Sequence, residues 1–206
     1  MAEHSVLTVM LGTANLHKVE EIRAIWHGYE LRAETLPGDT SWPDAPETGN
    51  TYLENALQKA KFYFELTNRP CVADDSGLEV EALGWAPGVH TKRFTPPGFS
   101  NEQKLQHMLD HLQNFPTPQQ RRARYRCTAV AYGFTPEPLV AEGTLNGWIG
   151  FQPRGKGGFG YDPIFCLEDS AQTLAQAGAE LKNTISHRSQ AMRKLAEMLV
   201  SLRAQK

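Results

Sequence analysis

The spacing of apolar residues changes along the chain, and the changes predict alternating strands and helices. Residues 6–11 are apolar and rich in branched side chains, which predicts a buried strand that ends at Gly12. Apolar residues then recur at helical spacing, at Val19, Ile22, Ile25 and Trp26. Residues 125–134 and 138–151 predict β structure, with Asn146–Gly147 as a tight turn. This pattern is typical of a mixed α/β protein.

Start signals and apolar faces predict three further helices. Thr51 with Glu54, and Ser100 with Gln103, have the spacing of capping boxes. A last helix is predicted to begin near Ser186. The predicted apolar faces are Leu53, Ala56, Leu57, Ala60 and Phe64; Leu105, Met108, Leu109 and Leu112; and Ala191, Leu195, Met198, Leu199 and Leu202.

Loops and one further strand complete the pattern. Residues 37–50 and 84–99 are rich in Gly and Pro, which predicts loops. Residues 78–82 alternate apolar and acidic side chains, which predicts a half-buried strand. Neither an internal repeat nor a linker interrupts the sequence, so we interpret residues 1–206 as a single domain.

Composition narrows the class of partner. The hydrophobic fraction of 40% is enough for a packed core, and the net charge of -2 argues against a nucleic-acid backbone as the main partner. No apolar run is long enough to span a membrane, and the first residues lack a basic leader. The three cysteines, Cys71, Cys127 and Cys166, have neither zinc-site nor disulfide-framework spacing. We therefore expect a protein of the reducing cytoplasm.

Two adjacent carboxylates, Asp74 and Asp75, follow the apolar residues 71–73 and precede Ser76 and Gly77. Neighbouring carboxylates repel, and each costs free energy if it leaves water without a partner. Asp, Ser and Gly are ordinary turn formers, so a solvated turn is one interpretation. A cation site at the end of a strand is the other.

Two glycine-containing segments offer groups suited to phosphate or to a planar ring. Residues 12–18, GTANLHK, lead into a predicted helix whose N-terminus suits phosphate. Taken alone, the segment is better explained as a plain helix cap with an exposed lysine. Residues 155–160, GKGGFG, satisfy the dinucleotide fingerprint GxGxxG, but Pro163 prevents the helix that this fingerprint must open. A loop that a ring or phosphate approaches closely, and a simple hairpin loop, are the two interpretations left.

Charged residues at helical positions add two candidates. Asn55 and Lys59 share one side of a predicted helix, and Glu47 precedes that helix, although such a side is usually solvated. His187 and Arg188 fall in the first turn of the last predicted helix, where cations oppose the helix dipole. A nearby anion or acceptor-rich ring would resolve that conflict, unless both side chains extend into water.

Together these candidates have the chemistry of a nucleoside-triphosphate site. Mg²⁺ typically binds through one or two carboxylates plus substrate phosphates, and Glu47 and Asp75 suit that role. Lysines and a helix N-terminus suit the phosphates, whereas aromatic and glycine surfaces suit the base.

Six motifs in this order resemble the inosine triphosphate pyrophosphatase family, whose members clear deaminated purine nucleotides. They are TANLHK, ETGNTYLENALQKA, ADDSGL, APGVHTKRF, GGFGYDPIF and SHRSQA, and they span almost the whole chain. The resemblance implies an elongated α/β fold with a long central mixed sheet flanked by helices, and two lobes with the nucleotide cleft between them. It also implies a homodimer and Mg²⁺-dependent hydrolysis of inosine, deoxyinosine and xanthosine triphosphates (ITP, dITP and XTP) to the monophosphate and pyrophosphate.

The resemblance further implies roles for individual residues. Asp75 would accept the proton of the attacking water, with Asp74 beside it, and Asp75 and Glu47 would bind Mg²⁺. Lys59 would be part of the catalytic group and, like Ser76, would contact the phosphate chain. The other implied substrate-binding residues are Thr13, Ala14, Asn15, Leu16, His17 and Lys18 for the phosphates, and Phe159, Gly160, Tyr161, Asp162, Lys182, His187 and Arg188 for the base and sugar.

The sequence departs from the family pattern at two positions. Ala14 stands where many members have glycine, which makes the phosphate loop less permissive. Lys92 stands where bacterial members often have a small residue, and it either adds a phosphate contact or faces solvent. A non-catalytic nucleotide-binding regulatory module is the alternative function, but Glu47, Lys59 and Asp75 favour an enzyme.

Overall fold

The structure, a computed structural model, describes residues 6–36 and 42–204. Its strands are β1 (Leu7–Leu11), β2 (Leu31–Glu34), β3 (Cys71–Val80), β4 (Arg122–Tyr132), β5 (Leu139–Ile149) and β6 (Phe165–Leu167). Its helices are α1 (Leu16–Ile25), α2 (Tyr52–Thr67), α3 (Asn101–His111), α4 (Leu174–Ile185) and α5 (His187–Ala204), with short 3-10 helices η1 (Glu81–Leu83), η2 (Gly88–Arg93) and η3 (Pro118–Arg121).

The strands form one mixed sheet in the order β2-β1-β3-β4-β5-β6. β1 pairs in parallel with both β2 and β3, whereas β5 pairs antiparallel with β6. The predicted α/β class, with a mixed sheet and flanking helices, is confirmed. No described helix is long and apolar enough to cross a membrane.

The chain divides into two compact units that share the long strands. The first unit comprises the described parts of residues 1–75, 127–143 and 187–206, and the second comprises 76–126 and 144–186. β3, β4 and β5 each contribute residues to both units. The two units are described separately below.

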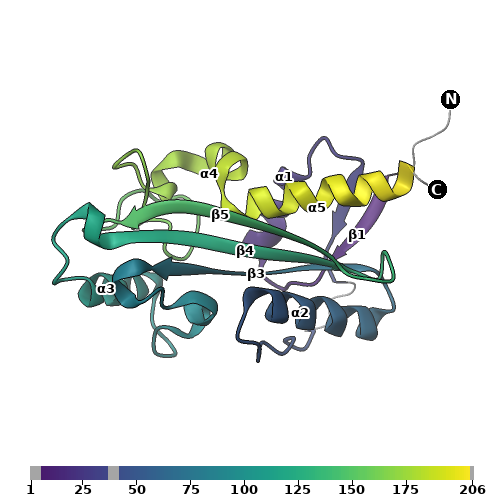
Figure 1. Cartoon of the computed structure of the whole chain (residues 1–206), viewed down its shortest axis with the longest axis horizontal. Helices are drawn as coiled ribbons and strands as arrows, with labels where there is room; N and C mark the ends of the chain where they lie inside the picture. Colours follow the sequence, from purple (N-terminus) through teal and green to yellow (C-terminus); the bar gives the residue numbers. More distant parts are fainter. Residues whose placement is uncertain (1–5, 37–41, 205–206) are drawn as a thin grey trace. The chain divides into compact units, whose positions relative to one another are not determined.

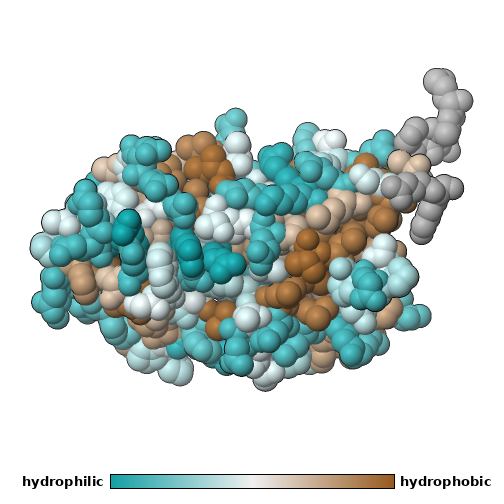
Figure 2. Space-filling model, in the orientation of Figure 1, coloured by the Kyte–Doolittle hydropathy of each residue, from teal (hydrophilic) through white to brown (hydrophobic). Residues whose placement is uncertain are grey.

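In the first unit, helices cover both faces of the strands (Figure 1). α1 and α5 pack on one face, where Ile22, Trp26, Val72 and Leu195 are buried together. α2 packs on the other face through small residues such as Ala56 and Ala60. Figure 2 shows hydrophobic surface over the strands between α5 and α2. Because successive residues of a strand point to opposite faces, neighbouring residues of β3 enter different helical environments.

In the second unit, α3 supplies the predicted apolar face. Leu105, Met108, Leu109 and Leu112 are all buried. They pack with Leu78, Val80 and Phe165 in one core. Residues 78–80 are fully or almost fully buried, so the predicted half-buried strand is wrong for this stretch. Residue 82 belongs to η1 and not to a strand.

Local capping chemistry predicted two helix starts. The Thr51 side chain accepts from the Glu54 backbone N–H, and the Glu54 carboxylate accepts from the Thr51 backbone N–H. The same reciprocal pair forms between Ser100 and Gln103 at α3. These bonds satisfy N–H groups that have no partner inside the helix. Both predicted capping boxes are therefore confirmed.

Neither of the two turns considered from the sequence is present. β3 runs without interruption through residues 74–77, where a turn was one of the two interpretations. Asn146 and Gly147 lie inside β5. A Cβ on Gly147 would come within 2.2 Å of the Cys166 carbonyl oxygen, so this glycine permits a close approach of β6. β2, β6 and α4 were not predicted, and of the predicted loop 37–50, residues 37–41 lie outside the described residues.

The inward face of α2 differs from the predicted one. Ala56 and Ala60 are buried as expected, but Leu53 is 42% exposed. Asn55 and Lys59 are buried instead. The solvated-face interpretation of these two residues is therefore wrong, and polar partners must exist for them inside the protein. At α5, Met198 is likewise exposed at 39%, whereas Ala191, Leu195 and Leu199 are buried as predicted.

Candidate active site

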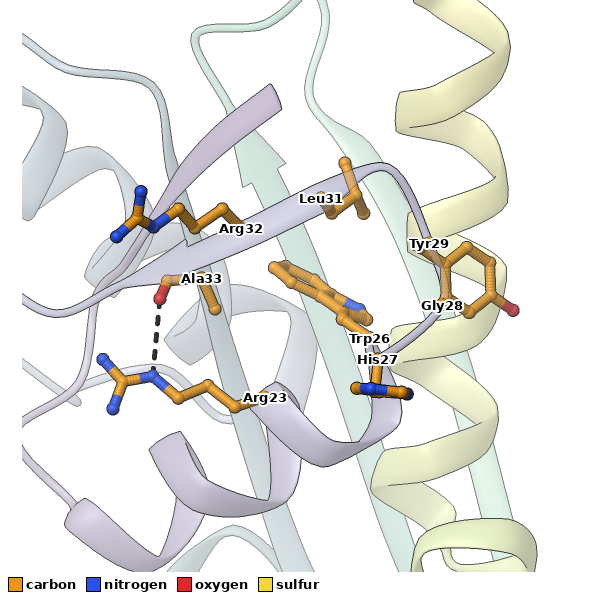
Figure 3. Close-up of a pocket in the computed structure, with 8 residues that line it drawn as sticks. All are labelled: Arg23, Trp26, His27, Gly28, Tyr29, Leu31, Arg32 and Ala33. Atoms are coloured by element: carbon orange, nitrogen blue, oxygen red, sulfur yellow. Dashed lines mark hydrogen bonds between the residues drawn. The ribbon is translucent and has the colours of Figure 1, made fainter. Parts of the chain in front are cut away.

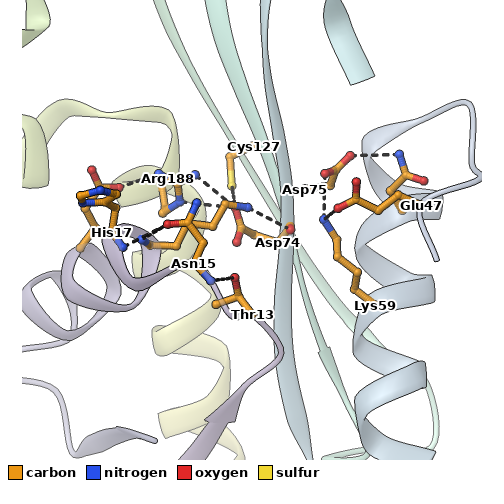
Figure 4. Close-up of polar contacts among 12 residues, drawn as sticks. Thr13, Asn15, His17, Glu47, Lys59, Asp74, Asp75, Cys127 and Arg188 are labelled. Atoms are coloured by element: carbon orange, nitrogen blue, oxygen red, sulfur yellow. Dashed lines mark hydrogen bonds and ion pairs between the residues drawn. The ribbon is translucent and has the colours of Figure 1, made fainter. Parts of the chain in front are cut away.

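Asp74 and Asp75 point to opposite faces of β3. Since β3 is continuous, the strand alternation sends the Asp74 carboxylate toward α1 and α5 and the Asp75 carboxylate toward α2 (Figure 4). The two carboxylates, which were expected at the end of a strand, instead lie within one. Each carboxylate has its own cations, so the repulsion expected between adjacent aspartates is largely avoided.

The Asp74 carboxylate is enclosed by positive charge. Its Oδ2 lies 3.0 Å from the Lys18 Nζ and 3.4 Å from the Arg188 Nε. The Cys127 thiol donates to the same oxygen over 3.7 Å. Arg188 is anchored a second time, because its Nη1 donates to Glu21 Oε2 at 2.5 Å. The Asp74 side chain is only 1% exposed, so this carboxylate is closed to solvent.

Burial and charge act against each other in this network. Burial would raise the pKa of Asp74, but Lys18 and Arg188 hold that pKa well below its usual range. For Lys18, burial and the nearby cations Lys59 and Arg188 hold the pKa below its ordinary value, although Asp74 acts to raise it. For Arg188, burial acts to lower the pKa, but Asp74 and Glu21 hold it above its ordinary value. Asp74 is thus a fixed anion and a poor proton acceptor.

The Asp75 carboxylate has a different set of partners. Lys59 Nζ donates to Asp75 Oδ1 at 2.8 Å and to Glu47 Oε1 at 3.0 Å. Asn55 Nδ2 donates to Asp75 Oδ2 at 3.1 Å. Burial lowers the pKa of Lys59, but Asp75, Asp74 and Glu47 raise it above its ordinary value overall, so the ammonium stays charged. The Glu47 side chain is 30% exposed, which leaves this side more open than the Asp74 side.

Local structure explains why these side chains meet. Asn55 and Lys59 are four residues apart on α2 and therefore share its face toward β3. The Asn55 Oδ1 accepts from the Gly49 backbone N–H at 2.8 Å, which ties the preceding loop to the helix. The same loop places the Glu47 carboxylate within hydrogen-bond distance of Lys59. The predicted grouping of Glu47, Asn55 and Lys59 is therefore present, although the burial of Asn55 was not foreseen.

The carboxylates of Glu47 and Asp75 converge on one ammonium and fit a divalent cation. Among the residues that the structure describes, no three His, Cys, Asp or Glu side chains are grouped as metal ligands. Mg²⁺ usually takes one or two carboxylates and completes its shell with water and substrate phosphates. Two converging carboxylates satisfy that requirement, provided that phosphate oxygens supply further ligands.

The segment Thr13–Lys18 forms the start of α1, as predicted. Asn15 is the N-cap, and its side chain accepts from the backbone N–H groups of His17 and Lys18 at 3.0 and 3.3 Å. Ala14, Asn15, Leu16 and His17 are exposed, and no acidic residue occupies the first turn. This exposed positive helix end carries Lys18, whose side chain extends to Asp74.

His187 and Arg188 open α5, and the conflict with the helix dipole is resolved by anions. Arg188 is paired with both Glu21 and Asp74, and both side chains of the His–Arg pair are buried. Of the interpretations considered, extension into water is wrong for Arg188. Glu21 was not singled out from the sequence, although its position three residues after Lys18 on α1 was a usable signal.

A second group of predicted residues gathers around Asp162 in the second unit. Asp162 Oδ2 accepts from Lys182 Nζ at 2.5 Å and from the Phe159 backbone N–H at 2.9 Å. The Lys182 ammonium lies 4.4 Å from the centre of the Phe159 ring. A Cβ on Gly158 would lie 2.1 Å from Asp162 Oδ2, and its φ of +70° also favours glycine. The loop 155–162 is therefore a fixed structure built around a buried carboxylate.

The neighbouring predicted residues belong to the same unit. Tyr161 is buried, and burial raises the pKa of its hydroxyl to about 12. Gly160 has a φ of +62° with open space where a Cβ would stand. Ser76 follows Asp75 in β3 and is half-buried. Residues 155–160 open no helix, so the rejection of a dinucleotide-binding fingerprint is confirmed.

Comparison with known proteins identifies the family. Residues 9–198 match the Ham1 family, and this match includes residues of both compact units. The chain belongs to the Ham1 family. The family resemblance inferred from the six motifs is thereby confirmed.

Two relatives of this Ham1-family chain are both named dITP/XTP pyrophosphatase. A dITP/XTP pyrophosphatase of Shigella flexneri is 40% identical over 93% of this chain and 97% of the relative. A dITP/XTP pyrophosphatase of Xylella fastidiosa is 43% identical over 93% of this chain and 96% of the relative. The solved structure of a HAM1 protein from Coxiella burnetii aligns with a TM-score of 0.82 and 35% identity, covering 95% of this chain and 99% of that protein.

Proposed function

We propose that this chain hydrolyses noncanonical purine nucleoside triphosphates, namely dITP, ITP and XTP, to the nucleoside monophosphate and pyrophosphate. The names of its Ham1-family relatives support this reaction. The observation that carries the proposal is the arrangement around Asp75, where Lys59, Asn55 and Glu47 meet on the more open face of β3. A carboxylate, an ammonium and a second carboxylate together suit the hydrolysis of a phosphoric anhydride.

Asp75 accepts the proton of the attacking water in this proposal. Each of its oxygens has one donor, Lys59 or Asn55, and each keeps a further lone pair. Asp74 is unsuited to this role because its charge is neutralised by Lys18 and Arg188 inside a closed network. Lys59 orients Asp75 and supplies positive charge near the phosphate chain.

The proposed metal is Mg²⁺, bound by Glu47 and Asp75. When bound, it would neutralise phosphate charge and polarise the anhydride. The exposed start of α1, Thr13–Lys18, and Ser76 are the further phosphate-binding residues of the proposal. The N-cap side chain of Asn15 already accepts from the backbone N–H groups of His17 and Lys18, so in this proposal the positive helix end and the Lys18 ammonium attract the phosphates.

For the base and sugar, the proposed residues are Phe159, Gly160, Tyr161, Asp162, Lys182, His187 and Arg188. The ring of Phe159 suits stacking on a purine, and Asp162 holds its backbone N–H in place. Arg188 is held by Asp74 and Glu21, so any contact with the base comes from a guanidinium that is already oriented. A homodimeric state and a cytoplasmic location also belong to this proposal.

A panel assay tests the proposed function. Purified protein would be incubated with dITP, ITP, XTP, ATP and GTP, and pyrophosphate would be measured apart from orthophosphate. We expect pyrophosphate release from the first three and its loss in excess chelator, with recovery on addition of Mg²⁺ and poorer recovery with Ca²⁺. Orthophosphate as the direct product would exclude a pyrophosphatase. Full turnover in chelator would exclude the metal assignment while leaving the reaction intact.

A further inference from the structure

A pocket of about 420 Å³ lies in the first unit, where α1 turns into β2 (Figure 3). Its lining residues are Arg23, Trp26, His27, Gly28, Tyr29, Leu31, Arg32 and Ala33. Gly28 forms the turn with a φ of +92°, a conformation that favours glycine. None of the residues proposed above for the nucleotide or the metal lines this pocket, so it is a separate feature of the fold.

The polar groups of the lining are hydrogen-bond donors or cations. Arg23, His27 and Arg32 are exposed, and Tyr29 adds a phenolic hydroxyl. No carboxylate is among the lining residues. Arg23 Nε donates to the Ala33 carbonyl oxygen over 3.4 Å, and Figure 3 shows the Arg23 and Arg32 side chains extending to the same side. Within residues 6–36 and 42–204, neither arginine forms an ion pair with a carboxylate. Such a lining attracts an anion.

The inner wall of the pocket is apolar and rigid. Trp26 is 2% exposed and Leu31 is 7% exposed. The Trp26 indole N–H donates to the Met192 carbonyl oxygen of α5 at 2.9 Å, which fixes the ring in the core. The Tyr29 ring lies at the outer end (Figure 3). Trp26 and Leu31 therefore expose little surface to a ligand, and the more exposed rings of the lining are those of His27 and Tyr29.

We propose that this pocket binds a phosphate monoester of nucleotide size. The phosphate would pair with Arg23 and Arg32, because guanidinium groups match phosphate oxygens geometrically and stay charged. The organic part would lie against the rings of His27 and Tyr29, above the buried Trp26. The volume falls in the range of small-molecule sites and exceeds what a free inorganic ion needs. The inference does not rest on the proposed hydrolysis, since it concerns different residues.

Nuclear magnetic resonance of the four tryptophan indole N–H groups tests binding at this place. The probe would be AMP, whose adenine the proposed catalytic site disfavours, with adenosine and orthophosphate as comparison ligands. We expect a saturable shift of the Trp26 resonance with AMP, a weaker response to orthophosphate and none to adenosine. The resonances of Trp42, Trp85 and Trp148 serve as internal references. An unsaturable shift, or adenosine binding as tightly as AMP, would overturn the proposal.

Two variants and a matched control locate the phosphate. Arg23→Gln and Arg32→Gln should each weaken AMP binding about tenfold or more, since each removes a charge-assisted hydrogen bond. Arg122→Gln removes one positive charge from an arginine that is 68% exposed in the second unit, and it should leave the affinity unchanged. Unchanged AMP affinity in Arg32→Gln would refute the proposal. The molar mass of each variant in solution would also be measured, and a variant that changes the oligomeric state but not the AMP affinity would refute it as well. The second result would identify the pocket as a contact between copies of the chain.

Discussion

The two faces of β3 at Asp74 and Asp75 carry the same side chain in different surroundings. On one face, Asp74 is paired with Lys18 and Arg188, and the network is closed by Glu21. On the other face, Asp75 is held by Lys59 and Asn55, and the neighbouring Glu47 side chain is 30% exposed. The closed face neutralises its anion inside the protein, whereas the other face keeps a route to solvent.

The face of β3 to which an aspartate points decides its partners, and its partners decide whether it suits a structural or a chemical role. A carboxylate that is fully neutralised by buried cations contributes to a cooperative fold but is a weak base. A carboxylate beside an ammonium and a more exposed second carboxylate can still receive a proton or a metal. We therefore expect substitutions at Asp75 to act mainly on turnover and substitutions at Asp74 to act mainly on stability.

The largest expected effect is that of Asp75→Asn on turnover. Removing a positioned general base typically costs about 10²–10⁴-fold in rate, and this residue is also a proposed metal ligand. Steady-state kinetics of pyrophosphate release with dITP would give kcat and KM separately, and we expect the loss mainly in kcat. Asp74→Asn is the matched control, and we expect it to lose less kcat per folded molecule than Asp75→Asn does. A harmless Asp75→Asn would remove Asp75 from the mechanism.

Asp74→Ala should have the next largest effect, on the free energy of unfolding. The substitution leaves Lys18 and Arg188 buried beside too little negative charge, and breaking a buried ion pair in this way typically costs about 3–5 kcal/mol. Urea denaturation followed by circular dichroism would measure the loss. Asp75→Ala should cost less, because Lys59 keeps Glu47 as a partner. The reverse order of stability would contradict the division between the two faces.

Arg188→Ala tests whether the closed face also reaches the base. If the guanidinium donates to the C6 oxygen of hypoxanthine, its loss should narrow the preference for ITP over ATP by about 10- to 100-fold, while the preference over GTP changes less. The measurement is the ratio of kcat/KM for the three triphosphates, normalised to folded protein. An unchanged ITP/ATP ratio would restrict Arg188 to holding Asp74 and Glu21.

The smallest expected effect is on acid stability. Because the folded protein holds the pKa of Asp74 below its unfolded value near 4, its contribution is present above about pH 4 and declines as the pH falls further. At pH 3 this single group should have lost about 1 kcal/mol of its contribution. Urea denaturation of the wild type and of Asp74→Asn at pH 7 and pH 3 would measure it. The stability gap between the two proteins should shrink at pH 3, and a constant gap would contradict the prediction.

The starts of two helices, one shared helix face in the candidate site and the family could be predicted from residue types and their order. The Thr51 and Ser100 capping boxes placed α2 and α3, because helix starts depend on residues three positions apart. The helical spacing of Asn55 and Lys59 put both on one face, where the structure has them. The six motifs predicted the family, and the relation to the Ham1 family is confirmed. The substrate-binding and metal-binding roles remain predictions.

The sequence by itself determined the starts of α2 and α3, the apolar face of α3 and the family, since these depend on local spacing or on the residue types of each motif. Only the tertiary structure decided that β3 continues through Asp74 and Asp75 and that the two carboxylates part. Local propensity favours a turn there, but buried cations make burial of the carboxylates tolerable. Two of them, Lys18 and Arg188, lie 56 and 114 residues from Asp74 in the sequence. Local sequence patterns cannot predict ion pairs between residues so far apart. The two adjacent aspartates therefore acquire different surroundings only when the fold brings cations to opposite faces of β3.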